Sequence, residues 1–175
     1  MLPIPIDVLE HILGHLDEAS LAKICQLNKI CCFYSQDVLY RELRIDGYSE
    51  VLETLAQSTH LARRVRLFRI SFICTKQKIP DELLCKSLQN MTNLRALRIF
   101  GLDLSVLDQC TFRLVSFRTS HHHPHHLVPF LHSQPSLKDV ALGLSFSNDV
   151  AFASTCLPNL TCIFAGSHNS SQIDQ

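Results

Sequence analysis

The sequence contains no tryptophan and only five glycines among its 175 residues. With so few glycines it has no glycine-rich loop of the kind that cradles phosphate groups, so nucleotide binding is disfavoured. It also lacks an excess of one charge, because 16 lysines and arginines balance 16 aspartates and glutamates. The net charge therefore gives no reason to expect nucleic acid or a membrane surface as a partner.

Export and membrane signals are missing as well. Asp7 and Glu10 interrupt the first apolar stretch and no basic residue precedes it, which is unlike a secretory signal. No run approaches the roughly 18 apolar residues that a membrane span needs. The eight cysteines contain no C-x-x-C pair. We therefore expect reduced, mostly buried thiols and a protein of the cytoplasm or nucleus.

Three short apolar segments follow one another between residues 4 and 43. In the first, the apolar residues from Val8 to Leu16 recur at the spacing of one helical face. A second apolar stripe runs from Leu21 to Cys32, and a third short helix is expected over 35–43. Such short helices cannot hide this much apolar surface among themselves. The pattern predicts either a docking surface for another protein or a helical cap on the following domain.

The order and spacing of these residues resemble the F-box family. That family's pattern is Leu-Pro-x-Glu-Ile-Leu, a spaced Ile and Leu, a Val-Cys-Arg-x-Trp stretch and a closing Leu-Trp. This chain departs from it at Ile4, at Cys31 in place of the first tryptophan, and at Tyr40 in place of the second. The positions that match the F-box pattern are Ile4-Pro5-x-Asp7-Val8-Leu9, Ile12, Leu16, Leu21, Ile24, Leu27, Leu39 and Leu43. Residues 60–66 also resemble a linker of fungal F-box proteins.

The resemblance implies a small all-helical module that binds the Skp adaptor and, through it, a cullin-RING ubiquitin ligase. In this mode of recognition an exposed apolar stripe is buried in a groove of its partner. The loss of bulk at Cys31 is expected to weaken that contact. The residues that the resemblance places against the adaptor are Ile4, Pro5, Val8, Leu9, Ile12, Leu16, Leu21, Ile24 and Leu27.

After residue 47 the pattern changes to helical segments that alternate with strand-like L-x-x-L-x-L units. The clearest units begin at Leu94, Leu114, Leu137 and Leu160, which are 20, 23 and 23 residues apart. These periods lie within the range of about 20–29 residues that is typical of leucine-rich repeats. The asparagine or cysteine that usually follows each strand is missing. The units are therefore interpreted as degenerate leucine-rich-like repeats.

The predicted architecture has two parts. Residues 1–47 form the F-box-like all-α module, and residues 48–175 form a short α/β leucine-rich-repeat-like solenoid with parallel strands. A repeat array needs a cap over its last open core, whereas residues 167–175 are polar. The array is therefore expected to be truncated.

Arginines recur in the strand-like units. If the apolar residues point inward, with Ala62-x-x-Val65-x-Leu67 as the first unit, the intervening residues lie on the outer face of the strands. Such a face suits an acidic or phosphorylated segment with an apolar anchor, although a solvated strand edge is the simpler alternative. The predicted substrate-binding residues are Arg66, Phe68, Arg98, Phe100 and Arg118.

Other chemistry-bearing residues have simpler interpretations. The run 121–126, with five histidines, has no cysteine or carboxylate near it in sequence and is interpreted as a solvated loop. His11 and His15 are interpreted as interface or solvent histidines, and the cysteines as core or interface thiols. We expect no catalytic residue, no metal and no cofactor. A thiol- or metal-dependent enzyme is the third alternative.

These patterns together predict a non-enzymatic substrate-recognition subunit of a Skp–cullin–F-box ubiquitin ligase. Its N-terminal module would dock the Skp adaptor and its repeats would hold a target protein. The partners expected are therefore the adaptor, the ligase behind it and a protein substrate, but no nucleic acid and no membrane. The alternative is a protein-interaction scaffold whose drifted F-box-like module is not coupled to ubiquitination.

Overall fold

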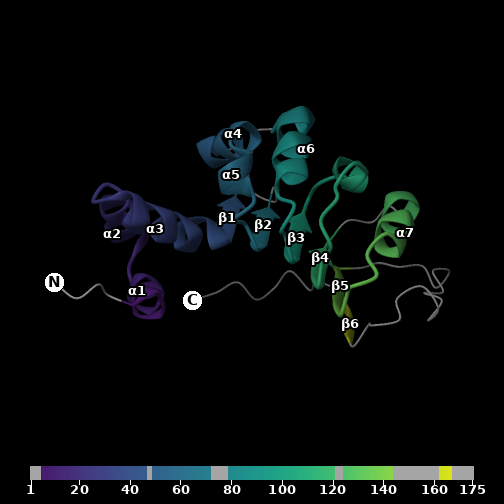
Figure 1. The fold of residues 1–175 in the computed structure, drawn as a ribbon. Helices are drawn as coiled ribbons and strands as arrows, with labels where there is room; N and C mark the ends of the chain where they lie inside the picture. Colours follow the sequence, from purple (N-terminus) through teal and green to yellow (C-terminus); the bar gives the residue numbers. More distant parts are fainter. Residues whose placement is uncertain (1–4, 47–48, 72–78, 121–123, 144–161, 167–175) are drawn as a thin grey trace, which may run out of the picture.

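The computed structural model describes residues 5–46, 49–71, 79–120, 124–143 and 162–166. Within these ranges the chain forms seven α-helices, one 3-10 helix and one six-stranded sheet, so the fold is mixed α/β. Figure 1 shows three helices at one end of the molecule and the sheet, with its own helices, extending away from them. No helix in these ranges is long and apolar enough to cross a membrane.

The three N-terminal helices are α1 (Ile6–Leu13), α2 (Glu18–Ile24) and α3 (Lys29–Arg41). Side-chain caps begin the second and third of them. Asp17 accepts a hydrogen bond from the Ser20 amide at 2.7 Å, and Asn28 accepts one from the Cys31 amide at 2.9 Å. The apolar stripe predicted from Leu21 to Cys32 is therefore split, because Asn28 starts a new helix with its own phase.

The sheet consists of β1 (Glu42–Asp46), β2 (Leu67–Ser71), β3 (Ala96–Phe100), β4 (Ser116–Thr119), β5 (Asp139–Gly143) and β6 (Cys162–Gly166). Each strand pairs in parallel with the next strand of the chain, so the order in space equals the order in sequence. The predicted parallel strands are confirmed. Because β1 belongs to this sheet, the sheet begins before the boundary predicted at residue 47.

One side of the sheet is covered by α4 (Glu50–Gln57), α5 (Thr59–Ala62), α6 (Asp81–Asn90), the 3-10 helix η1 (Leu104–Leu107) and α7 (Pro124–His132), as Figure 1 shows. Polar side chains join neighbouring helices of this layer. The Ser87 hydroxyl donates to the Leu52 carbonyl at 2.8 Å, and the Asn90 amide donates to the Leu55 carbonyl at 3.0 Å. The second bond satisfies a carbonyl in the last turn of α4.

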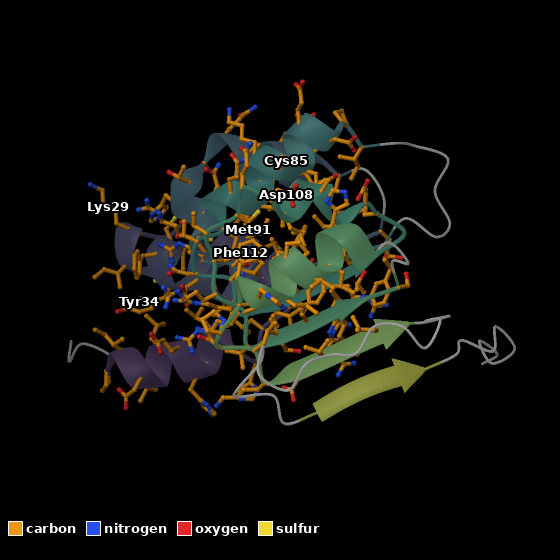
Figure 2. The ribbon with its side chains drawn as sticks, turned by 90° about the vertical axis from the view of Figure 1, so that its right-hand side faces the viewer. Lys29, Tyr34, Cys85, Met91, Asp108 and Phe112 are labelled. Carbon is orange, nitrogen blue, oxygen red and sulfur yellow. The ribbon has the colours of Figure 1, made fainter. Side chains whose placement is uncertain are left out.

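The core lies between the sheet and this helical layer. Figure 2 shows Met91 and Phe112 in that space, and both are buried. Burying one large apolar side chain contributes about 1.5–3 kcal/mol, so the strand residues that face the helices hold the two layers together. In strand order they form two columns, Phe68, Leu97, Phe117 and Val140 beside Ile45, Ile70, Ile99, Thr119 and Leu142.

The β2 unit has a different register from the one predicted. Phe68 is fully buried and pairs with Leu97, whereas Leu67 is only half-buried. The prediction that Phe68 lies on the outer face was therefore wrong. The error arises because apolar residues recur every three positions, at Ala62, Val65 and Phe68. The L-x-x-L-x-L unit can therefore begin at Ala62 or at Val65. The short helix α5 uses Ala62, so the strand unit begins at Val65.

Arg64 joins the N-terminal helices to the sheet. Its side chain is buried, and its guanidinium lies 4.2 Å from the centre of the Phe33 ring. It donates to the Phe33 carbonyl at 2.9 Å, and lies 3.0 Å from Nε2 of His60 and 3.5 Å from the Asp37 carboxylate. Since α3 supplies Phe33 and Asp37, this one side chain fixes α3 against the segment that leads into β2.

The register of β2 is testable with two neighbouring substitutions. Phe68→Ala is expected to lower the free energy of unfolding by about 3–5 kcal/mol, because it leaves a cavity in the core. Leu67→Ala is expected to cost about 1 kcal/mol or less, because that side chain is partly exposed. Chemical denaturation of both variants measures the difference. Equal losses would contradict the observed register.

The role of Arg64 is testable against its exposed neighbour. Arg64→Ala is expected to lower the free energy of unfolding by about 2–4 kcal/mol, because it removes charge-assisted hydrogen bonds and the contact with the Phe33 ring. Arg63→Ala, at an exposed position, is expected to change it by about 0.5 kcal/mol at most. Thermal and urea unfolding provide both values. An Arg64→Ala protein as stable as the wild type would show that the link contributes nothing.

Candidate functional site

Six large apolar side chains on the N-terminal helices are exposed, and they are called here the apolar face. They are Ile6, Val8 and Ile12 of α1, Leu27 between α2 and α3, and Ile30 and Phe33 of α3. Their exposed fractions run from 43% at Val8 to 70% at Leu27, and no other large hydrophobic residue in residues 5–46, 49–71, 79–120 and 126–142 is as exposed. Burying apolar surface stabilises a complex by about 25 cal/mol per Å², so a complex in which a partner covers this face is favoured.

The residues predicted to contact an adaptor differ in their exposure. The exposed ones are Pro5, Val8, Ile12 and Leu27, and the half-buried ones are Leu9, Leu16 and Ile24. Leu21 is only 3% exposed and belongs to the interior of the helices, so it adds nothing to the surface that an adaptor could cover on the isolated chain. Ile4 lies outside the described residues. Four of the predicted residues thus lie on the surface of the isolated chain.

Three members of the apolar face were missed from sequence. The expected first stripe begins at Val8 and so omits Ile6. Ile30 lies between Leu21 and Cys32 but off the helical face of the stripe expected there. Phe33 was not assigned to any stripe. The signal for the last two is Asn28, since an asparagine cap starts a new helix and resets which residues share a face.

A hollow of about 380 Å³ adjoins the apolar face where α2 gives way to α3. Cys31, the position at which the F-box pattern has tryptophan, does not line it. The residues that line the hollow are Cys25, Asn28, Lys29, Cys32, Phe33 and Gln36.

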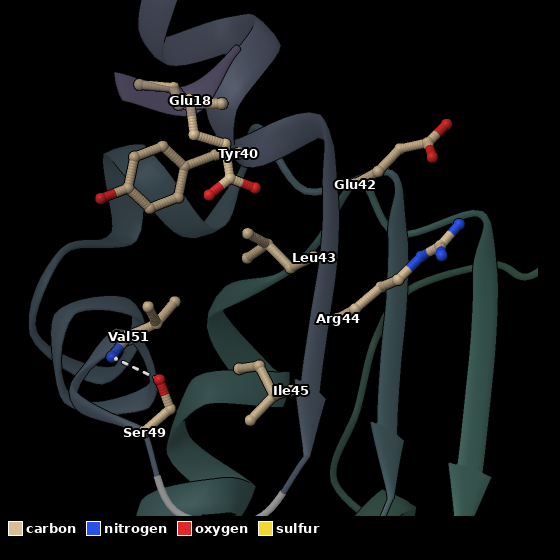
Figure 3. A pocket seen from close by; sticks show the side chains of 9 residues that line it. Glu18, Tyr40, Glu42, Leu43, Arg44, Ile45, Ser49 and Val51 are labelled. Atoms are coloured by element: carbon tan, nitrogen blue, oxygen red, sulfur yellow. Dashed lines mark hydrogen bonds between the residues drawn. The ribbon is translucent and has the colours of Figure 1, made fainter. Parts of the chain in front are cut away.

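A second candidate surface lies on the sheet face opposite the helices. Four arginines in consecutive strands are in register, and they are called here the arginine column: Arg44, Arg69, Arg98 and Arg118. In Figure 3, Arg44 and Glu42 point to one side of β1, and Leu43 and Ile45 point to the other side, toward Val51. Residues from both sides of this edge strand line a hollow of about 580 Å³. Alternation along the strand thus separates the column from the core.

The arginine column agrees only partly with the prediction. Arg98 and Arg118 are neighbours as expected, and Phe100 lies on the same strand as Arg98. Arg66 is not a member, because the shift in β2 puts Arg69 beside Arg98, while the Arg66 guanidinium donates to the Asn93 carbonyl at 3.4 Å. The missed members are Arg69 and Arg44, and the signal for both is the in-register pairing of their strands.

The column concentrates positive charge. Burial lowers the pKa of Arg98 below its ordinary value, and the charges of Arg118, Arg69 and Arg44 lower it further, against an opposing effect of Glu42. Nε of Arg98 is buried and has no hydrogen-bond partner among the described residues. Among the described residues, the column therefore combines repulsion between like charges with a buried donor that makes no hydrogen bond, and an anion would relieve both.

The histidines are the other residues considered as a site. His11 and His15 are exposed and their rings make an edge-to-face contact at 4.7 Å. His126 lies 3.9 Å from the Asp108 carboxylate, while residues 121–123 of the histidine run lie outside the described residues, as does the polar tail after residue 166. In the part of the chain that the structure describes, no three histidine, cysteine or acidic side chains are grouped so as to hold a metal ion.

Cys110 illustrates the state of the thiols. Burial raises the pKa of its thiol to about 12, and the nearby Cys85 and Asp108 add to the effect. Its thiol donates a hydrogen bond to the Val106 carbonyl, with 3.7 Å between the sulfur and the oxygen. Since the thiolate is the reactive form, a thiol that stays protonated near neutral pH is a poor nucleophile.

Alkylation tests this assignment. At pH 8 iodoacetamide is expected to modify Cys110 in the folded chain about a hundredfold or more slowly than in urea, because the thiolate is rarer and the group is half-buried. Mass spectrometry of the peptides gives both rates, and equal rates would contradict the assignment.

The same pKa shift makes the stability of the fold depend on pH. Since the pKa of the Cys110 thiol is raised in the folded state, the protonated thiol contributes its full stability below pH 9.0, and this contribution is lost as the pH rises towards about 12.

The comparisons with known proteins leave these surfaces to be interpreted on their own chemistry. No protein-family model matches the sequence, and no curated protein matches it.

Proposed function

We propose that this chain is the substrate-recognition subunit of a Skp–cullin–F-box type ubiquitin ligase. The observation that carries the proposal is the apolar face of α1, α2 and α3, which occupies the same forty residues as the F-box-like sequence pattern. The resemblance supplies the partner, and the exposed side chains supply a surface that gains free energy when an adaptor covers it. The chain itself makes and breaks no bond in this role.

The proposed mechanism is proximity. The N-terminal helices bind the Skp adaptor, and the remainder, as a leucine-rich-like solenoid, holds the target protein. The Arg64 contacts with Phe33 keep the two parts in a defined orientation. Tying target and ligase together in this way raises the effective concentration of target lysines near the charged ubiquitin carrier.

The alternative is an interaction scaffold whose N-terminal helices no longer reach a cullin complex. The loss of bulk at Cys31 favours this alternative, because an interface that leaves a void forfeits the dispersion contacts of the atoms that line it. The sheet would still bind a partner in this case. Only the coupling to ubiquitin transfer would be lost.

Adaptor binding separates the two. The wild-type chain is expected to bind purified Skp adaptor, and Val8→Asp or Ile12→Asp is expected to weaken binding about tenfold or more, because each buries an unpaired carboxylate at the interface. Lys86→Asp, an equally drastic change at an exposed position of α6, is the matched control and is expected to bind as the wild type does. Pull-down followed by a titration measures each affinity.

The outcomes are distinct. Wild-type binding that is lost in both α1 variants but kept in the control supports the receptor. No binding by the wild type overturns it and leaves the scaffold. Binding that survives both substitutions would place the contact on another surface, which also contradicts the proposal.

A further inference from the structure

We propose that the open face of the sheet binds an extended acidic segment of another protein, whose negatively charged side chains occupy alternate positions. The arginine column is the site, and Phe100 beside it receives an apolar side chain of the same segment. This inference names the class of target for the proposed receptor. It rests on that proposal only for its biological role, because the binding itself needs no adaptor.

Spacing is the first argument. Neighbouring strands lie about 4.8 Å apart, so the four arginines of the column extend over about 14 Å. An extended segment rises about 3.3 Å per residue and repeats the same side every second residue, so three alternate side chains extend over about 13 Å. A segment that crosses the strands with acidic residues at positions i, i+2 and i+4 therefore matches the column in length.

Unsatisfied charge is the second argument. No hydrogen bond or ion pair joins the four guanidinium groups of the column to another described residue, whereas Arg41 and Arg64 both reach Asp37. In addition, Nε of Arg98 is buried and has no hydrogen-bond partner in the part of the chain that the structure describes. Arginine presents its donors in a planar fork that fits carboxylate and phosphate oxygens, so an anion supplies what the column lacks.

An apolar anchor adjoins the column. The guanidinium of Arg69 lies 5.8 Å from the centre of the Phe100 ring, and that ring is only half-buried. The open-face positions at the other ends of β2 and β3, Leu67 and Ala96, are also half-buried and pair with each other. A segment with apolar residues close to its acidic ones finds a surface for both here.

The surroundings favour a peptide over a nucleic acid. Exposed carboxylates border the column, with Glu42 and Asp46 flanking Arg44 on β1 and Asp139 standing beyond Arg118 on β5. A nucleic-acid backbone carries a negative charge at every nucleotide, so some of its phosphates are repelled by these carboxylates. A peptide can place its few acidic side chains on the arginines alone. The chain as a whole also has no net positive charge.

The test uses the full chain and fluorescein-labelled peptides in fluorescence anisotropy at low salt. The first peptide has three glutamates at alternate positions with leucine and alanine between them. The second has glutamines in their place, and the third has phosphoserine in place of the central glutamate. The first is expected to bind at least about tenfold more tightly than the second, because glutamine side chains cannot form charge-assisted bonds with the arginines.

Variants locate the site. Arg69→Gln, Arg98→Gln and Arg118→Gln are each expected to weaken binding of the first peptide about tenfold, because each removes one charged fork. Lys86→Gln removes the same charge from the exposed side of α6, in the layer that covers the opposite face, and is expected to change binding less than about twofold. Arg118 is exposed, so its substitution leaves the fold intact.

Thermal unfolding separates binding from a structural role. Arg98→Gln is expected to melt at the same temperature as the wild type or higher, because it relieves repulsion from Arg69 and Arg118. A residue kept for stability would lower the melting temperature instead. Loss of binding together with unchanged or raised stability therefore supports the site.

Each remaining outcome decides the proposal. Binding of the phosphopeptide alone supports it and assigns the charge to phosphorylation. Equal binding of all three peptides overturns it, as does equal weakening by Lys86→Gln and Arg98→Gln. A ten-nucleotide single-stranded DNA that binds more tightly than any peptide through the same arginines also overturns it. Arg118→Gln is expected to keep adaptor binding, so failure here is distinguishable from failure of the ligase proposal.

Discussion

In-register parallel pairing is the constraint on which the rest of the structure depends. Each strand pairs with the next strand of the chain, so equivalent residues of successive units become neighbours. The apolar positions join into columns that face the helices, and one arginine in each of β1 to β4 becomes part of a continuous basic column. A single arginine on a strand is no evidence of a binding surface. Four at the spacing of parallel strands concentrate guanidinium donors that make no hydrogen bond or ion pair with another described residue.

The two candidate surfaces differ in chemistry and in their place in the fold. The apolar face is built on α1 to α3 and gains free energy by being covered, while the arginine column is built on the sheet and gains it by meeting opposite charge. Figure 1 shows the helices beyond the β1 edge and the sheet extending away from them. A chain with two such surfaces suits two different partners held at once, which is what a receptor or a scaffold requires.

Local sequence patterns predicted the parallel strands and part of each surface. They failed where two local signals compete. Residues 62, 65 and 68 share one apolar spacing, so the sequence allowed two registers for β2, and only its pairing with Leu97 places Phe68 in the core. Likewise, Asn28 interrupts an apolar stripe that is otherwise continuous in sequence. Its capping bond to Cys31 resets the helix and exposes Ile30.

By itself, the sequence determined the mixed α/β class, the alternation of helices with parallel strands, and an apolar surplus in the first forty residues, because these follow from periodicity along the chain. Only the tertiary structure decided that Leu21 is interior, that Arg69 and Arg44 join Arg98 and Arg118, and that Arg64 holds α3 in place. The reason is physical. Burial and register are set by partners distant in sequence, and a local pattern contains no record of which partner a strand or helix meets.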